Sequence, residues 1–162
     1  MGKIMRHQIA DYLNVGTQGE ENYVLMGAGF NSLNESSGAK SETTTYINDK
    51  ATSSYIKGYE TSFDFDTELI VEEEAANKIY DIARNQNIGT EAELEYVRVE
   101  LFRPCESEQD EYAARKFKVS VEVSNITGEG ASALKLSGSL KVVGDFVDGS
   151  FNTTTRVFTP CA

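Results

Sequence analysis

The chain has 162 residues, 40% of them hydrophobic and 10% aromatic, which suits one domain with a single core and is too apolar for an intrinsically disordered protein. Acidic residues number 26 and basic residues 15, and the net charge of −11 disfavours tight binding to the phosphates of a nucleic acid. Because the sequence shows neither a secretory signal nor the roughly 20 apolar residues of a membrane span, we expect a protein made in the cytoplasm.

The acidic residues are concentrated in the middle of the chain. Residues 60–111 carry 16 acidic and 4 basic side chains, whereas the rest of the chain carries 10 and 11. This asymmetry is typical of a negative face that meets a less negative one in an assembly. It is equally typical of a surface that only keeps a protein soluble, so the charge pattern leaves both interpretations open.

The first third of the chain predicts one short strand followed by a long loop. The strand is expected at residues 23–26. Residues 31–54 are rich in Ser, Thr, Gly and Lys around an isolated Tyr46-Ile47, and they exceed the length of an ordinary connection. Loops this long are disordered or functional, and we expect this one to be mobile in a free subunit and ordered against a neighbouring molecule.

A second strand is expected at residues 55–66. Its end alternates, with Phe63 and Phe65 on one face and Asp64 and Asp66 on the other. The two carboxyl groups then lie about 7 Å apart, a separation found in inverting glycosidases. A solvated strand face explains the same pair equally well.

The pattern changes to helical spacing over residues 71–86. Acidic residues precede the apolar positions, and Gly89 follows the expected end. The apolar side chains on the expected buried face are Ala75, Ala76, Ile79, Ile82 and Ala83. One amphipathic helix is predicted here, followed by a strand at residues 94–102.

Residues 114–143 predict one long antiparallel hairpin with its turn at residues 127–130. The apolar positions of its two arms alternate with polar ones and are Phe117, Val119, Val121, Val123, Leu134, Leu136, Leu140 and Val142. A Thr-rich last strand is expected at residues 151–157, before Pro160.

No catalytic, cofactor-binding or metal site is predicted. The single imidazole, His7, lies near a terminus, where a catalytic partner is hard to hold in place. The acidic run 72–74 points in three directions around a helix and cannot converge on one ion.

The order of several short strings along the chain is informative as a set. They are Tyr-Val-Leu-Met-Gly at 23–27, Tyr46-Ile47-Asn48-Asp49-Lys50, Gly58-Tyr59, Ser62-Phe63-Asp64-Phe65, Ile79-Tyr80-Asp81-Ile82-Ala83, Ala114 to Val119, Gly128-Glu129-Gly130, Val143-Gly144-Asp145, Gly149-Ser150-Phe151 and Thr153-Thr154-Thr155. Between residues 8 and 160 this order resembles the major tail protein, or tail tube protein, family of bacteriophages with long non-contractile tails that infect Gram-positive bacteria.

The resemblance implies a fold, an assembly and a set of partners. The fold would be one domain over residues 1–162, an antiparallel β-sandwich or open barrel flanked by one helix. The subunits would stack as six-membered rings into a tube in the virion, assembled in the host cytoplasm, that conducts double-stranded DNA into the host cell. Partners would be other copies of the chain, the tape measure protein and the tube-terminating proteins, with no cofactor and no enzymatic activity.

Two sets of residues follow from that assembly. If residues 59–66 and 114–143 form the inner wall, the channel would be lined by their polar side chains, namely Asp64, Asp66, Lys118, Ser120, Glu122, Ser137 and Ser139. Lys135 and Lys141 also lie on the polar face of the hairpin, so the hairpin alone does not ensure a negative channel. Contacts between subunits would use the loop residues Tyr46, Ile47, Asn48, Asp49 and Lys50.

The alternative is a monomeric β-rich carbohydrate-binding or adhesion module. In such a module, sugar rings would stack on tyrosines, the candidates being Tyr12, Tyr23, Tyr46, Tyr55 and Tyr59. The lack of tryptophan weakens this alternative.

Overall fold

The computed structural model describes residues 2–17, 19–106 and 108–161. Its elements in chain order are the strands β1 (Ile9–Asn14), β2 (Tyr23–Leu25), β3 (Phe30–Ser36), β4 (Ala39–Thr44), β5 (Ser53–Tyr59) and β6 (Ser62–Glu68), the helix α1 (Glu74–Arg84), and the strands β7 (Glu93–Pro104), β8 (Glu111–Thr127), β9 (Lys135–Val142), β10 (Val147–Asn152) and β11 (Val157–Pro160). Short 3-10 turns at Arg6–Gln8 and Gly89–Ala92 precede β1 and β7.

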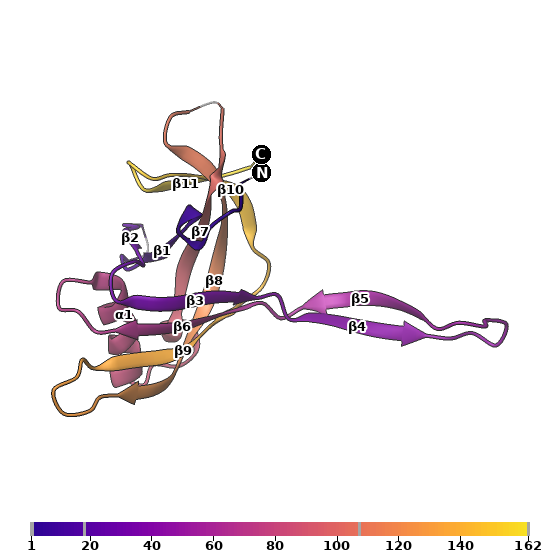
Figure 1. Cartoon of the computed structure of the whole chain (residues 1–162), viewed down its shortest axis with the longest axis horizontal. Coiled ribbons are helices and arrows are strands. Elements are labelled where there is room, and N and C mark those ends of the chain that lie inside the picture. The colour runs from indigo at the N-terminus through magenta and orange to yellow at the C-terminus, as the bar shows by residue number, and fades with distance from the viewer. Residues whose placement is uncertain (1, 18, 107, 162) are drawn as a thin grey trace.

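Most strands form one curled antiparallel sheet with the order β2-β1-β7-β8-β9-β6-β3, and β10 and β11 extend it beside the first half of β8 (Figure 1). β2 and β3 end this path on opposite edges, yet only residues 26–29 separate them in the chain. The sheet must therefore curl until its edges approach, as a half-barrel. The expected fold class, mainly antiparallel β with one flanking helix, is confirmed.

The main core lies on the inner face of this half-barrel, where α1 packs. Ile79 and Ile82 of the helix join a cluster of buried side chains from the sheet that includes Leu33, Phe63, Phe65, Phe117, Val119, Leu136 and Leu140. The apolar spacing of the sequence predicts this helix, because its apolar residues recur on one side.

The helix begins later than the predicted residue 71, because the chain before it forms a different set of hydrogen bonds. The side-chain amide of Asn77 donates to the carbonyl oxygens of Ile70, Val71 and Glu73 at 2.8–3.1 Å. These bonds satisfy carbonyl groups just before the helix and hold residues 70–73 as a turn. The helix ends at Arg84, two residues before Gln86 adopts a φ of 51°.

A second, smaller cluster lies on the opposite, outer face, near the chain termini. Its buried side chains are Tyr12, Tyr23, Val97, Val99, Ala114 and Phe151. The Tyr12 and Phe151 ring centroids are 4.5 Å apart, and Tyr23 meets Phe151 edge-on at 5.8 Å. Strands β7 and β8 therefore contribute to both clusters, one on each face.

A hairpin is formed within the predicted residues 114–143, because β8 and β9 pair from Val119↔Val142 to Thr127↔Lys135. The predicted bounds are too wide, since the connection is residues 128–134 and not 127–130, and β8 before Val119 pairs with β10 on this side. A β-bulge between Val123 and Asn125 interrupts the ladder opposite Gly138. Because the bulge adds one residue to β8, Asn125 and Thr127 stay on the polar face and Ile126 on the apolar one.

The expectation of a long loop at residues 31–54 is wrong. These residues form β3, β4 and the beginning of β5, and β4 pairs with β5 as a separate two-stranded ribbon that projects from the body of the molecule (Figure 1). Nearly every side chain of the ribbon is exposed, so neither of its faces is buried. Without a buried face a strand lacks the alternation that identifies it in a sequence.

Two other strand predictions are also wrong. Residues 55–66 contain the end of β5 and most of β6, which belong to different sheets. The expected last strand, residues 151–157, is interrupted by a turn in which the Asn152 side-chain oxygen accepts hydrogen bonds from the backbone N–H groups of Thr154 and Thr155. Asn side chains form such turns readily and stop the ladder.

Candidate functional site

The polar residues predicted to line a channel lie together on one face of the sheet. We call this the polar face: the side of β6, of β9 and of β8 from Lys118 onward that points away from α1. The register aligns Asp64 with Ser139 and Ser139 with Glu122 across three strands, and it aligns Asp66 with Ser137 in the next row. All seven residues share this face, namely Asp64, Asp66, Lys118, Ser120, Glu122, Ser137 and Ser139.

The polar face extends onto β7, because Ser120 lies opposite Glu93 and Lys118 lies opposite Glu95. Counting Glu68 and Lys135, which face each other at one end, its charged side chains are Asp64, Asp66, Glu68, Glu93, Glu95, Glu122, Lys118, Lys135 and Lys141. Acidic side chains therefore outnumber basic ones on this face. The face is acidic but not uniformly so, as the lysines of the hairpin indicate.

Contacts within the polar face hold three of its charged groups. The Ser139 hydroxyl donates a hydrogen bond to the Asp64 carboxylate, and the Lys118 ammonium lies 3.2 Å from the Glu93 carboxylate. Asp64, Glu122 and Lys118 remain exposed to solvent. Asp64 is exposed and Asp66 is partly buried on the side of the sheet that points away from α1.

The residues predicted for contacts between subunits form the tip of the ribbon. The backbone N–H of Asp49 donates to the Tyr46 carbonyl at 3.0 Å, and the Asp49 carboxylate accepts from the Tyr46 N–H at 2.9 Å, which closes a turn at residues 46–49. Asn48 and Lys50 belong to the same exposed tip. Ile47 is fully exposed, at 109% of its reference area, and Tyr46 is 68% exposed.

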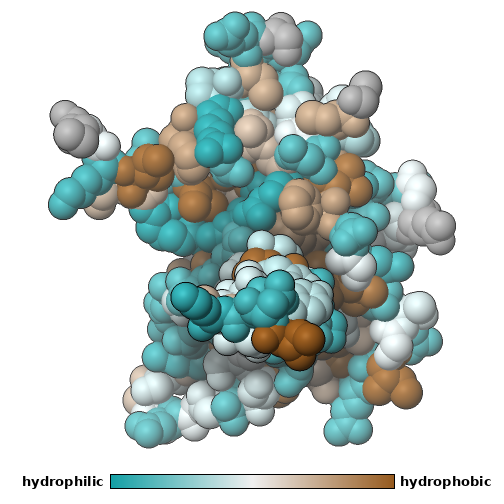
Figure 2. All heavy atoms as spheres, turned by 90° about the vertical axis from the view of Figure 1, so that its right-hand side faces the viewer, coloured by the Kyte–Doolittle hydropathy of each residue, from teal (hydrophilic) through white to brown (hydrophobic). Residues whose placement is uncertain are grey.

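Figure 2 looks along the ribbon from its tip and shows mostly hydrophilic side chains with a hydrophobic spot among them. On the strands, Tyr55, Ile56 and Tyr59 are also between 52% and 66% exposed. A two-stranded ribbon alone is at best marginally stable in water. Exposed apolar side chains on such an element are typical of a surface that becomes buried in a partner.

Inside the half-barrel lies a cluster of charged groups that the sequence did not predict. We call it the inner ionic cluster, and its members are Arg6, Asp11, Glu35, Tyr96, Arg98 and Arg115. Alternation does not reveal it, because Asp11 and Arg98 lie in strands that are buried on both faces. A charged residue within such a run is the one signal that the sequence offers.

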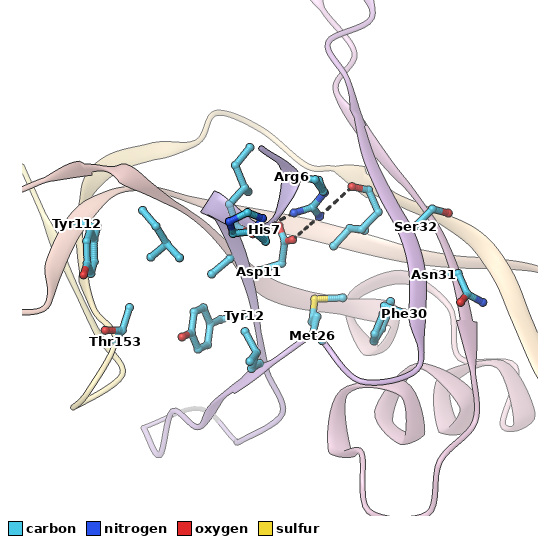
Figure 3. A pocket seen from close by; sticks show the side chains of 16 residues that line it. Arg6, His7, Asp11, Tyr12, Met26, Phe30, Asn31, Ser32, Tyr112 and Thr153 are labelled. Carbon is cyan, nitrogen blue, oxygen red and sulfur yellow. Dashed lines mark hydrogen bonds and ion pairs between the residues drawn. The ribbon is translucent and has the colours of Figure 1, made fainter. Parts of the chain in front are cut away.

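Asp11 is the centre of this cluster and is 3% exposed. Its carboxylate lies 2.7 Å from the Arg6 guanidinium and 3.6 Å from that of Arg98, and it accepts a hydrogen bond from the Tyr96 hydroxyl. Burial, and then the charge of Asp11, raise the pKa of Tyr96 well above its ordinary value, so this hydroxyl stays protonated and donates. Arg6 also donates to the Leu33 carbonyl, which connects the N-terminal segment to β3 (Figure 3).

A cavity of about 750 Å³ borders this cluster and is lined by Arg6, His7, Tyr12, Met26, Phe30 and Tyr112 among others (Figure 3). His7, considered above for catalysis, lies at its exposed rim. Among the described residues, no group of three or more His, Cys, Asp or Glu side chains is placed to hold a metal ion. Within the same residues, no helix is long and apolar enough to cross a membrane.

The tyrosines of the alternative carbohydrate-binding interpretation do not form one surface. Tyr12 is 6% and Tyr23 is 2% exposed, and both belong to the outer core cluster. The other three lie on the ribbon. Burial therefore keeps Tyr12 and Tyr23 from stacking on a sugar ring, whereas Tyr46, Tyr55 and Tyr59 are exposed.

Comparisons with known proteins find solved structures with the same fold. No protein-family model matches the chain, and no curated protein matches it. Solved structures of two tails and of a baseplate are among those that resemble it. The SPP1 tail tube superposes with a TM-score of 0.68 and 14% identity over 90% of this chain and 78% of its own.

The tail of an empty GTA particle, determined with C6 symmetry, gives a TM-score of 0.59 with 9% identity over 90% of this chain and 98% of its own. The baseplate of the anti-feeding prophage gives a TM-score of 0.51 with 6% identity, over 90% of this chain and 95% of its own. Identities this low relate folds and not activities. The chain has the fold of the subunits that build these tail assemblies.

Proposed function

We propose that the chain is a structural subunit of a bacteriophage tail tube, which stacks as six-membered rings and conducts double-stranded DNA through their centre. The observation that carries the proposal is the polar face, an open acidic surface on the side of the curled sheet opposite to α1. The fold shared with the SPP1 tail tube and with a six-fold symmetric tail supports it. No catalytic step is proposed.

The charge of the polar face suits a channel through which DNA slides. Six copies of Asp64 and Asp66 would place twelve carboxylates around one ring. The Debye length is about 8 Å at physiological salt, so stacked rings would add to a continuous negative field close to the wall. Because acidic side chains outnumber the three lysines on this face, such a wall would repel the phosphates on balance, which would keep DNA from binding tightly on its way.

Open strand edges and the ribbon would form the contacts between subunits within a ring and between stacked rings. β2 and β3 are the edges of the main path and each pairs on one side only within the described residues. Open edges favour pairing with another chain, and a cyclic arrangement closes them all. The ribbon would contact a neighbouring subunit or the next ring through Tyr46 to Lys50. Tape measure and tube-terminating proteins are the other partners we propose, in a virion of a long-tailed phage of a Gram-positive host.

Electron microscopy of the purified protein tests the assembly. We expect rings or tubes for the whole chain, and single subunits for a variant in which residues 40–58 are replaced by a short Gly-Ser linker. A whole chain that stays a 17.8 kDa monomer at every concentration and at every salt would refute the tube. Normal tubes from the shortened variant would refute the role of the ribbon.

Substitution of the wall tests the channel. The double variant Asp64→Lys and Asp66→Lys changes the net charge of each subunit by +4 on the polar face. The matched control Glu72→Lys and Asp81→Lys makes the same change at exposed positions just before α1 and on it. We expect tubes of normal length from both, because three of the four positions are exposed and Asp66 is only partly buried, and surface substitutions change stability by less than roughly 0.5 kcal/mol. Phage that carry Asp64→Lys and Asp66→Lys should eject DNA slowly, whereas phage that carry the control substitutions should eject it at the normal rate. Equal ejection rates would refute the channel assignment.

A further inference from the structure

The ribbon continues the β3-β6 ladder across a short interruption. The last pair of the main sheet is Ser36↔Ser62, and the first pair of the ribbon is Ala39↔Tyr59. Two residues on each strand, 37–38 and 60–61, lie between these pairs, and we call these four residues the joint. Because no continuous ladder connects the ribbon to the main sheet, the joint determines the direction in which the ribbon points.

The joint is held by a few specific hydrogen bonds. The Glu60 N–H donates to the Gly38 carbonyl at 3.0 Å, and the Thr61 hydroxyl donates to the Ser37 carbonyl at 3.4 Å. On the other side, the Val142 N–H donates to the Thr61 carbonyl at 3.1 Å and ties the joint to the end of β9. The joint therefore has one defined backbone shape.

Gly38 is the residue that this shape requires. Its φ is +56°, a conformation that favours glycine, and a Cβ added here would lie 2.2 Å from the Glu60 carbonyl oxygen. Gly58, in the same ribbon, has open space around the corresponding position and no left-handed φ. Gly38 therefore cannot take a side chain without strain, whereas Gly58 can.

Glu35 holds β3 in place three residues before Gly38. Its carboxylate is bound by the Arg115 guanidinium at 2.7 and 3.4 Å, and the Arg98 guanidinium lies 3.6 Å away. Two-pronged contacts of this kind restrict direction as well as distance. Through Glu35 the inner ionic cluster anchors the strand that leads into the joint.

Strand pairing among the described residues does not replace these contacts. Within the described residues, β4 and β5 pair only with each other. A groove of about 860 Å³ lies beside the joint, lined by Ser37, Gly58, Tyr59, Thr61 and Phe146 among others, and leaves room for the ribbon to lean. The direction of the ribbon therefore depends on the joint and on the anchored strand before it.

We infer that Gly38 and Glu35 are positioning residues that determine the direction in which the ribbon leaves the sheet, and that assembly requires that direction. The first half concerns the free subunit, whereas the second half rests on the proposed function. The ribbon amplifies small changes: eight residues separate Ala39 from Ile47, and at about 3.3 Å per residue a turn of about 20° at the joint moves the tip by roughly 9 Å.

Distances between spin labels test the first half. Labels on Asn48→Cys at the tip and Asp81→Cys on α1, with Cys105→Ser and Cys161→Ser, report the position of the tip by pulsed electron paramagnetic resonance. We expect a narrow distribution for the parent and for Gly58→Ala, and a distribution shifted or broadened by several ångströms for Gly38→Ala and for Glu35→Gln. Thermal unfolding of each variant shows whether the body is folded. If Gly38→Ala does not fold, Glu35→Gln carries the test, and a parent-like distribution for the folded variants would overturn the inference.

Tube formation by the unlabelled variants tests the second half. We expect Gly58→Ala to form tubes as the parent does, and Gly38→Ala to form at least tenfold fewer under the same conditions. A variant with an altered tip position that still assembles normally would refute the requirement for direction. A parent that never assembles would refute the proposed function, while the distance measurement would still decide whether the joint positions the ribbon.

Discussion

Replacement of Asp11 by asparagine tests how far the inner ionic cluster stabilises the fold. The substitution keeps the shape of the side chain but removes the charge that faces Arg98, whose side chain is 8% exposed, and Arg6, which is 49% exposed. Removing one partner of a buried ion pair costs about 3–5 kcal/mol, because the other charge stays buried without compensation. For a domain of this size that corresponds to a fall in melting temperature of about 6–20 °C.

The assay is urea-induced unfolding of the free subunit, followed by circular dichroism at two protein concentrations so that assembly does not add to the apparent stability. Glu60→Gln is the matched control, because its carboxylate lies 3.4 Å from Lys40 with 75% of the side chain exposed, and such pairs contribute less than about 1 kcal/mol. If Asp11→Asn lowers the free energy of unfolding no more than the control does, Glu35 alone compensates the charge of Arg98, and the argument for Asp11 is refuted.

Three further predictions concern the core, the bulge and alkaline pH. Ile79→Asp places a charge at a fully buried position and should cost about 4 kcal/mol or more, so circular dichroism should show an unfolded chain and not merely an unassembled one. Gly138→Ala should destabilise by about 1–3 kcal/mol in urea unfolding, because its Cβ would lie 2.0 Å from a carbonyl oxygen of β8, and a neutral result would contradict the described bulge. Burial raises the pKa of Tyr12, Tyr23 and Tyr96, so the unfolded chain releases protons near pH 10 that the folded chain keeps. Stability should therefore be intact below about pH 10 and fall above it by up to about 4 kcal/mol per pH unit, which urea titrations at about pH 9 and about pH 11 measure.

The elements that the sequence predicts are those with one buried face. In β8 and β9 the apolar residues face α1 and the polar ones face solvent, so period-2 alternation marks both strands and their hairpin. The helix is similar, since Ile79 and Ile82 mark its buried side. The same alternation separates the polar side chains within β6 and within the hairpin, whereas the expectation that the two sets share one surface came from the resemblance to tail tube proteins.

The missed elements lack this contrast. β1 is buried at four consecutive residues, Asp11 to Asn14, and the ribbon is exposed on both sides, so neither alternates. The pairing of β6 with β9 depends on how the sheet curls, which is a property of the tertiary structure. The inner ionic cluster joins residues up to 109 positions apart in the chain, from Arg6 to Arg115, and no local pattern connects them.

The length of β8 has a consequence for how the molecule unfolds. This strand pairs with β7 along one side, while β10 and β9 divide its other side between them, and its two faces serve the two hydrophobic clusters. Because residues of β8 belong to both hydrophobic clusters, neither cluster can unfold without displacing the strand on which the other packs. We therefore expect one cooperative transition for the whole body, with amide hydrogens of β7 and β8 exchanging only through global unfolding and those of the ribbon exchanging much earlier.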